Sequence, residues 1–267
     1  MSWLILALLT LAFSAAPAQS MTFEYRIWSG DTPDAERKMT LVVSGPIEPG
    51  DAARFRKFIA NDPQAFLKFS GGVVLDSPGG SVQDALELAQ LFRELLVTVA
   101  VFSPARCASS CFLLYVGAPT RWANGFPASP ALAIHRPYFS QSTAEKMSPS
   151  QADQAHSQLF EKTRTWLQNQ LVPQELIDKL ISLPSSEAYW LTQNDINQLG
   201  SRAPWYEEWI LARCPDLVRA YDYLNASWDT PRENEAKLRY DRSAFCESEQ
   251  KIPFIKQSLR ELGFALP

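Results

Sequence analysis

The chain has 267 residues, of which 46% are hydrophobic and 20% are charged, and its formal net charge is −4. This length and composition are those of a globular protein with a full hydrophobic core, built as one large domain or as a domain plus an extension. No basic run or Lys/Arg stripe occurs, so we expect no nucleic-acid partner.

The first residues form an uncharged apolar run. It extends from Trp3 to Phe13, and Ala16 and Ala18 follow it at the spacing of a signal-peptide cleavage site. The run is shorter than the roughly 20 apolar residues that a membrane span needs. We therefore predict a signal peptide at residues 1–18 and an exported protein, periplasmic or extracellular. The alternative is an uncleaved anchor that tethers the exported body to the membrane, because no Lys or Arg precedes the run.

Export changes the interpretation of the four cysteines. Cysteines pair in an oxidising compartment, and we predict a disulfide between Cys214 and Cys246. Cys107 and Cys111 lie on either side of a serine pair, and they either form a bridge or leave Cys111 as a buried free thiol. Because the chain has only two histidines and the wrong cysteine spacing, we expect no zinc site and no other metal.

Strand and helix patterns alternate through the first half of the chain. The clearest helix extends from Ser81 to Leu96, where apolar residues recur every three or four positions and Asp84 completes a capping pattern with Ser81. The segment from Ser109 to Val116 is apolar all round and predicts a buried helix or strand. Short apolar or β-rich runs predict strands at Met39–Ser44, Gly72–Ser77, Val97–Phe102 and Ala131–His135. This βαβ series predicts an α/β fold with a mostly parallel sheet and right-handed crossovers.

The remaining segments frame this region. Residues 19–38 are polar and predict a tail or an edge hairpin, and residues 39–205 form the predicted catalytic domain. Helices are expected within that domain at 151–171, 173–183 and 192–199. Residues 206–267 predict a helical C-terminal extension.

A glycine-rich turn and a serine pair carry residue types suited to acyl transfer. Gly79 and Gly80 lie between a strand and a helix, where free N–H groups can hold an oxyanion, although a plain strand-to-helix turn also favours these residues. Ser109 and Ser110 stand where a loop enters an apolar segment. A helix N-terminus favours an alkoxide there, and the Ser110 N–H can join the oxyanion hole. The alternative is that either serine only caps the helix.

His135 follows an apolar strand and is suited to act as a general base at neutral pH, while the alternative is a structural histidine. Together, the segments SPGGSV (77–82), CAS (107–109) and IHRP (134–137) resemble the proteolytic subunit of the Clp protease and, more loosely, signal peptide peptidase A. The resemblance covers about residues 39–202 and implies a Clp/crotonase-type spiral of βαβ units. It implies Ser109 as nucleophile, His135 as base, and N–H groups of Gly79, Gly80 and Ser110 as oxyanion hole. It also implies a homo-oligomer.

Three positions, in two segments, depart from the family's pattern. Ala188 stands where the family has its aspartate, so the adjacent Glu187 becomes the candidate third catalytic residue, with Asp195 and Asp178 as further candidates. Ser110 and Cys111 stand where Met-Gly or Gly-Gly is usual.

These patterns predict an exported serine hydrolase, a peptidase that acts on peptides or misfolded proteins through a Ser–His pair. We expect no cofactor, and no ATP-dependent unfoldase as partner, because an exported protein meets no ATP and the chain has no phosphate-binding loop. Two alternatives stay open. One is a catalytically inactive binding or scaffolding module of the same fold, which the missing aspartate favours. The other is a crotonase-like acyl-thioester enzyme, which export disfavours.

Overall fold

The computed structural model describes residues 20–28, 38–68, 72–123, 131–139, 145–184, 186–215 and 231–266, and for residues 38, 39 and 231–244 it describes the backbone only. The predicted signal peptide, residues 1–18, lies outside the described residues.

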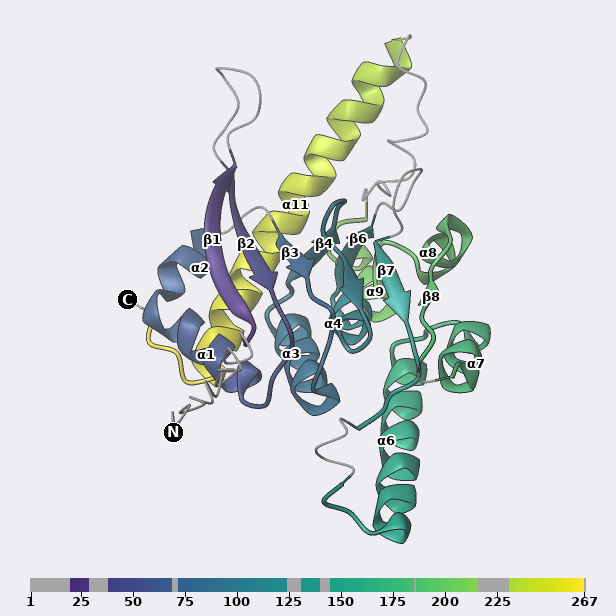
Figure 1. Ribbon diagram of the computed structural model, residues 1–267. Helices are drawn as coiled ribbons and strands as arrows, with labels where there is room; N and C mark the ends of the chain where they lie inside the picture. The colour runs from purple at the N-terminus through teal and green to yellow at the C-terminus, as the bar shows by residue number, and fades with distance from the viewer. Residues whose placement is uncertain are drawn as a thin grey trace, which may run out of the picture.

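A five-stranded sheet in the order β1-β2-β3-β4-β6 forms the centre of the fold (Figure 1). Strands β2 to β6 of this sheet run parallel to one another, and β1 pairs antiparallel with β2 at the edge. The prediction of an α/β fold with a mostly parallel sheet is confirmed. The strands are Thr22–Trp28 (β1), Lys38–Ser44 (β2), Val73–Asp76 (β3), Thr98–Val101 (β4) and Thr120–Ala123 (β6).

A second, three-stranded sheet contains the strands that lead into Ser109 and His135. It contains β5 (Cys107–Ala108), β7 (Leu132–Ile134) and β8 (Tyr189–Trp190). Strand β7 lies between its neighbours, parallel to β5 and antiparallel to β8. The strand predicted at Ala131–His135 is therefore present as β7, and it pairs outside the central sheet. Strands of two or three residues contain too few side chains to indicate which sheet they join.

The helices cover the sheets and extend the chain at its C-terminal end. Helix α3 begins after Ser81, whose side chain accepts the Asp84 N–H as the sequence predicted. Helix α4 is buried on all sides, and it begins at Cys111, two residues after the expected start. The helices are Asp51–Asn61 (α1), Pro63–Lys68 (α2), Val82–Glu94 (α3), Cys111–Gly117 (α4), Pro149–Asn169 (α6), Gln174–Ser182 (α7), Gln193–Leu199 (α8), Pro204–Leu211 (α9) and Pro231–Glu261 (α11).

One large hydrophobic core joins the central sheet to its helices. Leu41, Leu75 and Val99 of the strands are fully buried with Phe55 of α1 and Phe92 of α3. The two phenylalanine rings lie 5.5 Å apart in an edge-to-face arrangement, which is favourable for aromatic pairs. This packing fixes β3 and α3, and with them the turn that connects the two elements.

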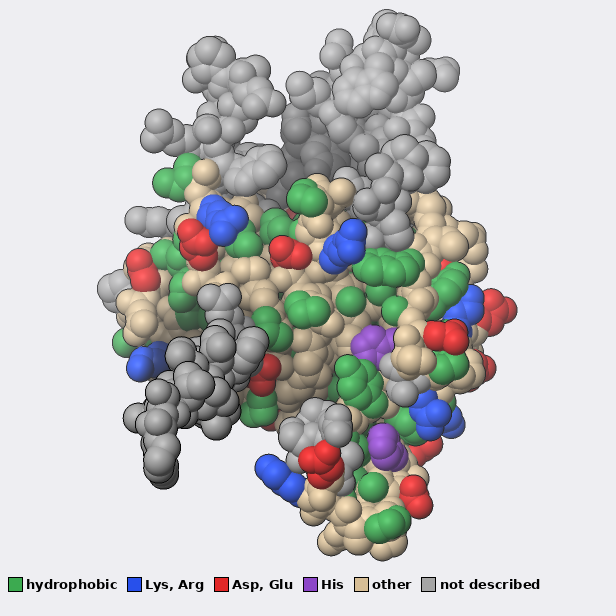
Figure 2. All heavy atoms as spheres, in the orientation of Figure 1, with side chains coloured by type: hydrophobic (Ala, Val, Ile, Leu, Met, Phe, Trp, Pro, Cys, Tyr) green, Lys and Arg blue, Asp and Glu red, His purple; other side chains and the backbone are tan. Residues whose placement is uncertain are grey.

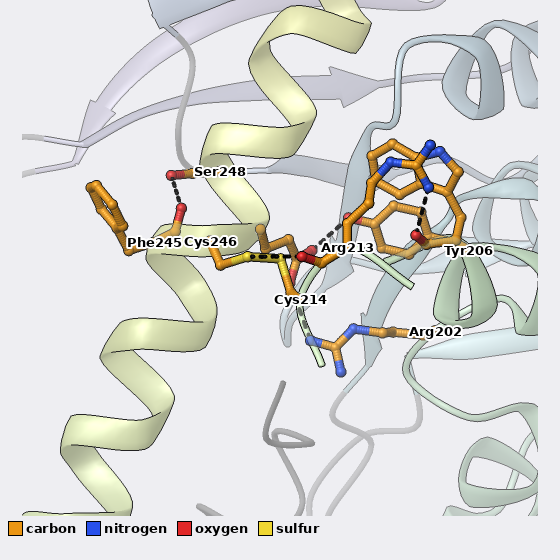
Figure 3. Close-up of a disulfide and its surroundings, with 9 residues drawn as sticks. Arg202, Tyr206, Arg213, Cys214, Phe245, Cys246 and Ser248 are labelled. Atoms are coloured by element: carbon orange, nitrogen blue, oxygen red, sulfur yellow. Dashed lines mark hydrogen bonds and ion pairs between the residues drawn. A yellow bond between two sulfur atoms is a disulfide. The ribbon is translucent and has the colours of Figure 1, made fainter. Parts of the chain in front are cut away.

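A smaller core attaches the C-terminal region. Tyr206 and Ile210 of α9 are fully buried beside Leu96, which follows α3. The Cys214–Cys246 disulfide joins the segment after α9 to α11, as Figure 3 shows. Helix α11 runs alongside the body and extends beyond it (Figure 1). None of the helices in the described ranges is long and apolar enough to cross a membrane.

Arg121 on β6 holds two helix C-termini together. Its guanidinium donates to the Val116 carbonyl of α4 at 2.7 Å, and to the carbonyls of Leu199 and Gly200 at the end of α8. The side chain is buried, and burial lowers the pKa of Arg121 from its ordinary value. Helix C-termini carry partial negative charge, so these carbonyls are suitable partners for a buried cation. The contact fixes α4, whose N-terminal end follows the serine pair.

Candidate active site

Ser109 occupies a sharp turn between β5 and α4. Its φ of +59° lies in the left-handed region, which a residue other than glycine rarely adopts. The Ser109 N–H donates to the carbonyl of Ala133 on β7 at 3.0 Å, and its carbonyl accepts the N–H of Phe112 in α4 at 3.0 Å. Such a turn directs the side chain away from both the strand and the helix, and strained backbone of this kind is concentrated at functional sites. The Ser109 side chain is half-buried.

A disulfide closes this turn. Cys107 and Cys111 lie on either side of the serines, with their Cα atoms 5.2 Å apart, and both are fully buried. The structure thus has the bridge between these two cysteines that the sequence left open.

The glycine turn packs directly against the serine turn. Gly79 has a φ of +91°, and a Cβ atom added to it would lie 2.6 Å from the Ala108 carbonyl oxygen and 2.6 Å from Ser109 Cβ. Real Cβ atoms do not approach other heavy atoms so closely, so no larger residue fits here. The Ala108 N–H also donates to the Ser77 carbonyl at 3.0 Å. The two turns, predicted to converge from separate segments, therefore form one contact.

The N–H groups proposed for an oxyanion hole are not equivalent. The Gly79 N–H donates to Ser77 Oγ at 3.1 Å, and the Gly80 N–H donates to Ser110 Oγ at 2.7 Å. The Ser110 hydroxyl in turn donates to the Gly80 carbonyl at 3.1 Å, and Ser110 is buried. The Ser110 N–H has no hydrogen-bond partner within the described part of the chain. Of the predicted donors, it is the one available to a ligand in this conformation.

His135 follows β7, the strand that pairs with β5. The register aligns Cys107 with Leu132 and Ala108 with Ala133, so His135 lies just beyond the residues that pair with the serine turn. The ring is half-buried, and Figure 2 shows histidine side chains (purple) at the surface of the face viewed. No hydrogen bond between described residues joins His135 to Ser109.

The His135 ring has a backbone partner. Its Nδ1 lies 2.9 Å from the carbonyl oxygen of Arg136. A carbonyl oxygen can only accept a hydrogen bond, so Nδ1 carries the hydrogen. The Nε2 atom then has the free lone pair that a general base requires.

Glu187 is exposed, and its N–H donates to the Pro184 carbonyl at 3.0 Å. Strand β8 aligns Tyr189 with Ile134 in the antiparallel pair. Continuing this register by one residue places Ala188 opposite His135. The position where the resembled family has its aspartate thus continues the strand register toward His135, and it holds an alanine.

The two further carboxylate candidates have other partners. Asp195 accepts hydrogen bonds from the Thr192 N–H at 2.8 Å, the Thr192 hydroxyl at 2.7 Å and the Tyr189 hydroxyl at 2.8 Å. Burial raises the pKa of Asp195, but these hydrogen bonds and the charge of Lys179 outweigh burial and lower it overall. Asp195 thus belongs to the capping box of α8, in which Thr192 is the N-cap and the Asp195 side chain accepts the Thr192 N–H. Asp178 is exposed on α7 and accepts from Gln174 at 2.7 Å.

Sequence reasoning missed two features of this site. The Arg136 carbonyl gives no signal in a sequence, because every residue has one. The contact of the Ser110 hydroxyl with Gly80 had a partial sequence signal, because serine stands where the resembled family usually has methionine or glycine. Among the described residues no group of three or more His, Cys, Asp or Glu side chains is placed to hold a metal ion.

The structure defines this chain as an α/β protein with a mostly parallel central sheet, in which a strand-to-helix turn presents a serine beside a glycine turn. Searches against protein-family models and curated proteins find no match. Among solved structures, the chain is similar to a mutant of the 1510-N membrane-bound stomatin-specific protease, with 16% identity, a TM-score of 0.40, and coverage of 65% of this chain and 82% of that one. It is also similar to ClpP1 from Listeria monocytogenes, with 15% identity, a TM-score of 0.40, and coverage of 61% and 88%. At this identity and TM-score the likeness says nothing about the chemistry of this chain, which has to be inferred from its own geometry.

Proposed function

We propose that the protein is an exported serine hydrolase, a peptidase in which Ser109 is the nucleophile and His135 the general base. The observation that carries this proposal is the left-handed backbone of Ser109 at a strand-to-helix turn. The same residue's N–H bonds to β7, the strand that leads to His135. Strained backbone of this kind is concentrated at functional sites, and here it packs the serine against Gly79 of the glycine turn.

The proposed reaction is acyl transfer to water. Ser109 Oγ attacks the peptide carbonyl carbon while His135 Nε2 accepts the hydroxyl proton, and that proton then passes to the leaving amine. The Ser110 N–H donates to the oxyanion. A water molecule, deprotonated by the same imidazole, attacks the acyl-enzyme ester. The ester C–O bond then breaks, the imidazolium returns its proton to Ser109 Oγ, and the acid product leaves.

We propose that the Arg136 carbonyl orients the imidazole. Its contact with Nδ1 selects the tautomer in which Nε2 is the base, which is one of the two roles of the aspartate in a serine triad. A neutral carbonyl stabilises the imidazolium less well than a carboxylate, so a slow enzyme is expected. Glu187 stays a candidate for the third residue if its exposed side chain turns toward His135.

The substrate class is peptide or misfolded exported protein. Two disulfides support maturation in an oxidising compartment, and therefore export. The homo-oligomer that the family resemblance implies stays a prediction, which sedimentation of the purified chain would test.

A serine-reactive fluorophosphonate probe tests the nucleophile. We expect labelling of the wild-type protein, loss of labelling in Ser109→Ala, and retained labelling in the matched variant Ser110→Ala. Mass spectrometry of the labelled peptide would locate the modified hydroxyl. Labelling at Ser110 would overturn the assignment, and no labelling of the folded wild-type protein would overturn the hydrolase proposal.

A second candidate function is a non-catalytic binding or scaffolding module of the same fold. The hydrogen bonds already made by the Gly79 and Gly80 N–H groups favour it, as does Ala188 opposite His135. This candidate predicts no labelling and no peptide cleavage. The crotonase-like acyl-thioester enzyme remains a third alternative, and tight binding of coenzyme A in calorimetry would support it.

A further inference from the structure

A cavity lies between α11 and the main body, away from the serine turn. Its volume is about 420 Å³, which is within the range of small-molecule sites. Its walls are mostly aliphatic and aromatic side chains from α2, from the segment that connects α3 to β4, and from α11. They include Phe66, Leu95, Val97, Ile252 and Ile255.

Among the described residues that line this cavity, Lys251 of α11 is the one with a charged side chain. Its Nζ donates to the hydroxyl of Thr98, which also lines the cavity, at 3.3 Å. The side chain is half-buried, and burial of the ammonium group lowers the pKa of Lys251 from its ordinary value. A buried charge is costly unless an opposite charge compensates it.

The nearest carboxylate already has other partners. Glu247, one turn earlier on α11, pairs with Arg202 at 3.2 Å and accepts a hydrogen bond from the Tyr206 hydroxyl at 2.7 Å. The charge of Glu247 acts to raise the pKa of Lys251, but burial outweighs it, and no ion pair within the described residues includes Lys251. The lysine does contact the Tyr206 ring, with Nζ 5.7 Å from its centroid, which is a weak interaction at that distance.

We propose that this cavity binds a small amphipathic carboxylate, with the carboxylate on Lys251 and Thr98 and the alkyl chain among the apolar walls. The charge of Lys251 selects an anion, and the hydroxyl beside it supplies a second donor. The apolar walls select an alkyl chain over a small inorganic anion. The proposal is independent of the chemistry at Ser109.

The site depends on α11 being held in place. The Cys214–Cys246 disulfide and the Arg202–Glu247 ion pair both join this helix to the α9 region, close to the cavity. Binding experiments therefore require the oxidised, full-length mature chain.

Isothermal titration tests the proposal, with decanoate below its micelle concentration and decanol below its solubility limit. We expect decanoate to bind about tenfold or more tightly than decanol, because a charge-assisted hydrogen bond is lost with the alcohol. In Lys251→Met this preference should disappear, while decanol binding is retained. Lys256→Met, an exposed lysine on the same helix, is the matched control and should keep the preference. Circular dichroism and thermal unfolding of each variant establish that it is folded.

Three outcomes would overturn the proposal. One is equal affinity of the wild-type protein for decanoate and decanol, and another is an unchanged preference in folded Lys251→Met. The third is no binding of decanoate while an apolar peptide with a free C-terminus binds, which would assign the cavity to a peptide.

Discussion

The Ser110 hydroxyl accepts the Gly80 N–H at 2.7 Å and donates to the carbonyl of the same glycine at 3.1 Å. A single buried side chain thus satisfies both backbone groups of a residue expected to serve the oxyanion hole. The arrangement joins the glycine turn to the serine turn, and it also occupies the N–H that an oxyanion would need. For Gly80 to take part in catalysis, the Ser110 side chain must rotate.

Replacing Ser110 with alanine separates its stabilising contact with Gly80 from its effect on the availability of the Gly80 N–H. Ser110→Ala leaves the Gly80 N–H without a partner, so we expect the free energy of unfolding to fall by about 1–3 kcal/mol. The same change opens the N–H to an oxyanion, so fluorophosphonate labelling of Ser109 should be at least as fast as in the wild-type protein. Denaturant titration and labelling kinetics measure the two effects. Slower labelling in a variant of native stability would mean that the hydroxyl assists the reaction rather than blocking the donor.

The Cys107–Cys111 bridge should stabilise both the fold and the serine turn. Replacing both cysteines with alanine removes a constraint on a short loop, worth about 2 kcal/mol by chain-entropy arithmetic. We also expect slower labelling of Ser109, because its left-handed conformation is held between the two cysteines. Thermal unfolding and labelling kinetics test this, with the Cys214→Ala, Cys246→Ala double variant as control. The control should lose stability but keep the labelling rate, and equal labelling rates in all three proteins would exclude a role for the bridge at the turn.

Arg121 should be essential to stability, because its side-chain hydrogen bonds within the described ranges reach backbone carbonyls at two helix ends. Arg121→Met leaves three buried or partly buried carbonyl groups without their donor, so we expect a loss of about 3 kcal/mol or more in the free energy of unfolding. Arg121→Lys should recover little of the lost free energy of unfolding, because an ammonium group cannot reproduce the planar guanidinium that reaches two helix ends. Chemical denaturation measures both variants against Arg56→Met, an exposed position on α1 expected to change by less than about 0.5 kcal/mol. Near-native stability of Arg121→Lys would show that charge alone is sufficient.

Asp195 should make stability depend on pH at the start of α8. Its folded pKa is lowered from the ordinary value of 3.8, so the native state favours the ionised form. Its stabilising contribution is therefore complete above that ordinary value, and it is lost as the pH falls through the lower folded pKa. Asp195→Asn should cost about 1 kcal/mol at neutral pH, and the difference from wild type should shrink on acidification. Denaturation across this pH range tests the prediction, and Asp178→Asn, an exposed position, is the control, expected to change the free energy of unfolding by less than about 0.5 kcal/mol at neutral pH.

The local elements were predictable because their signals lie within a few residues. The apolar spacing from Val82 to Phe92, with a serine cap, specified α3, and the structure has that helix and that cap. The continuous apolar character of α4 indicated burial without deciding between helix and strand. The short β5, β7 and β8 could not be assigned to a sheet, because two or three residues show no distinguishing period.

By itself, the sequence determined the α/β class, the order of the main elements and the residue types at the two turns, because periodicity, capping and glycine-rich turns are encoded locally. Only the tertiary structure decided that Ser110 bonds to Gly80, thirty positions away, and that Ala188 follows the register to a place opposite His135. It also decided that the Ser109 N–H bonds to Ala133 of β7 and that Gly79 packs against Ala108. The physical reason is that strand register and helix packing, which no single segment contains, determine which hydrogen-bonding groups meet.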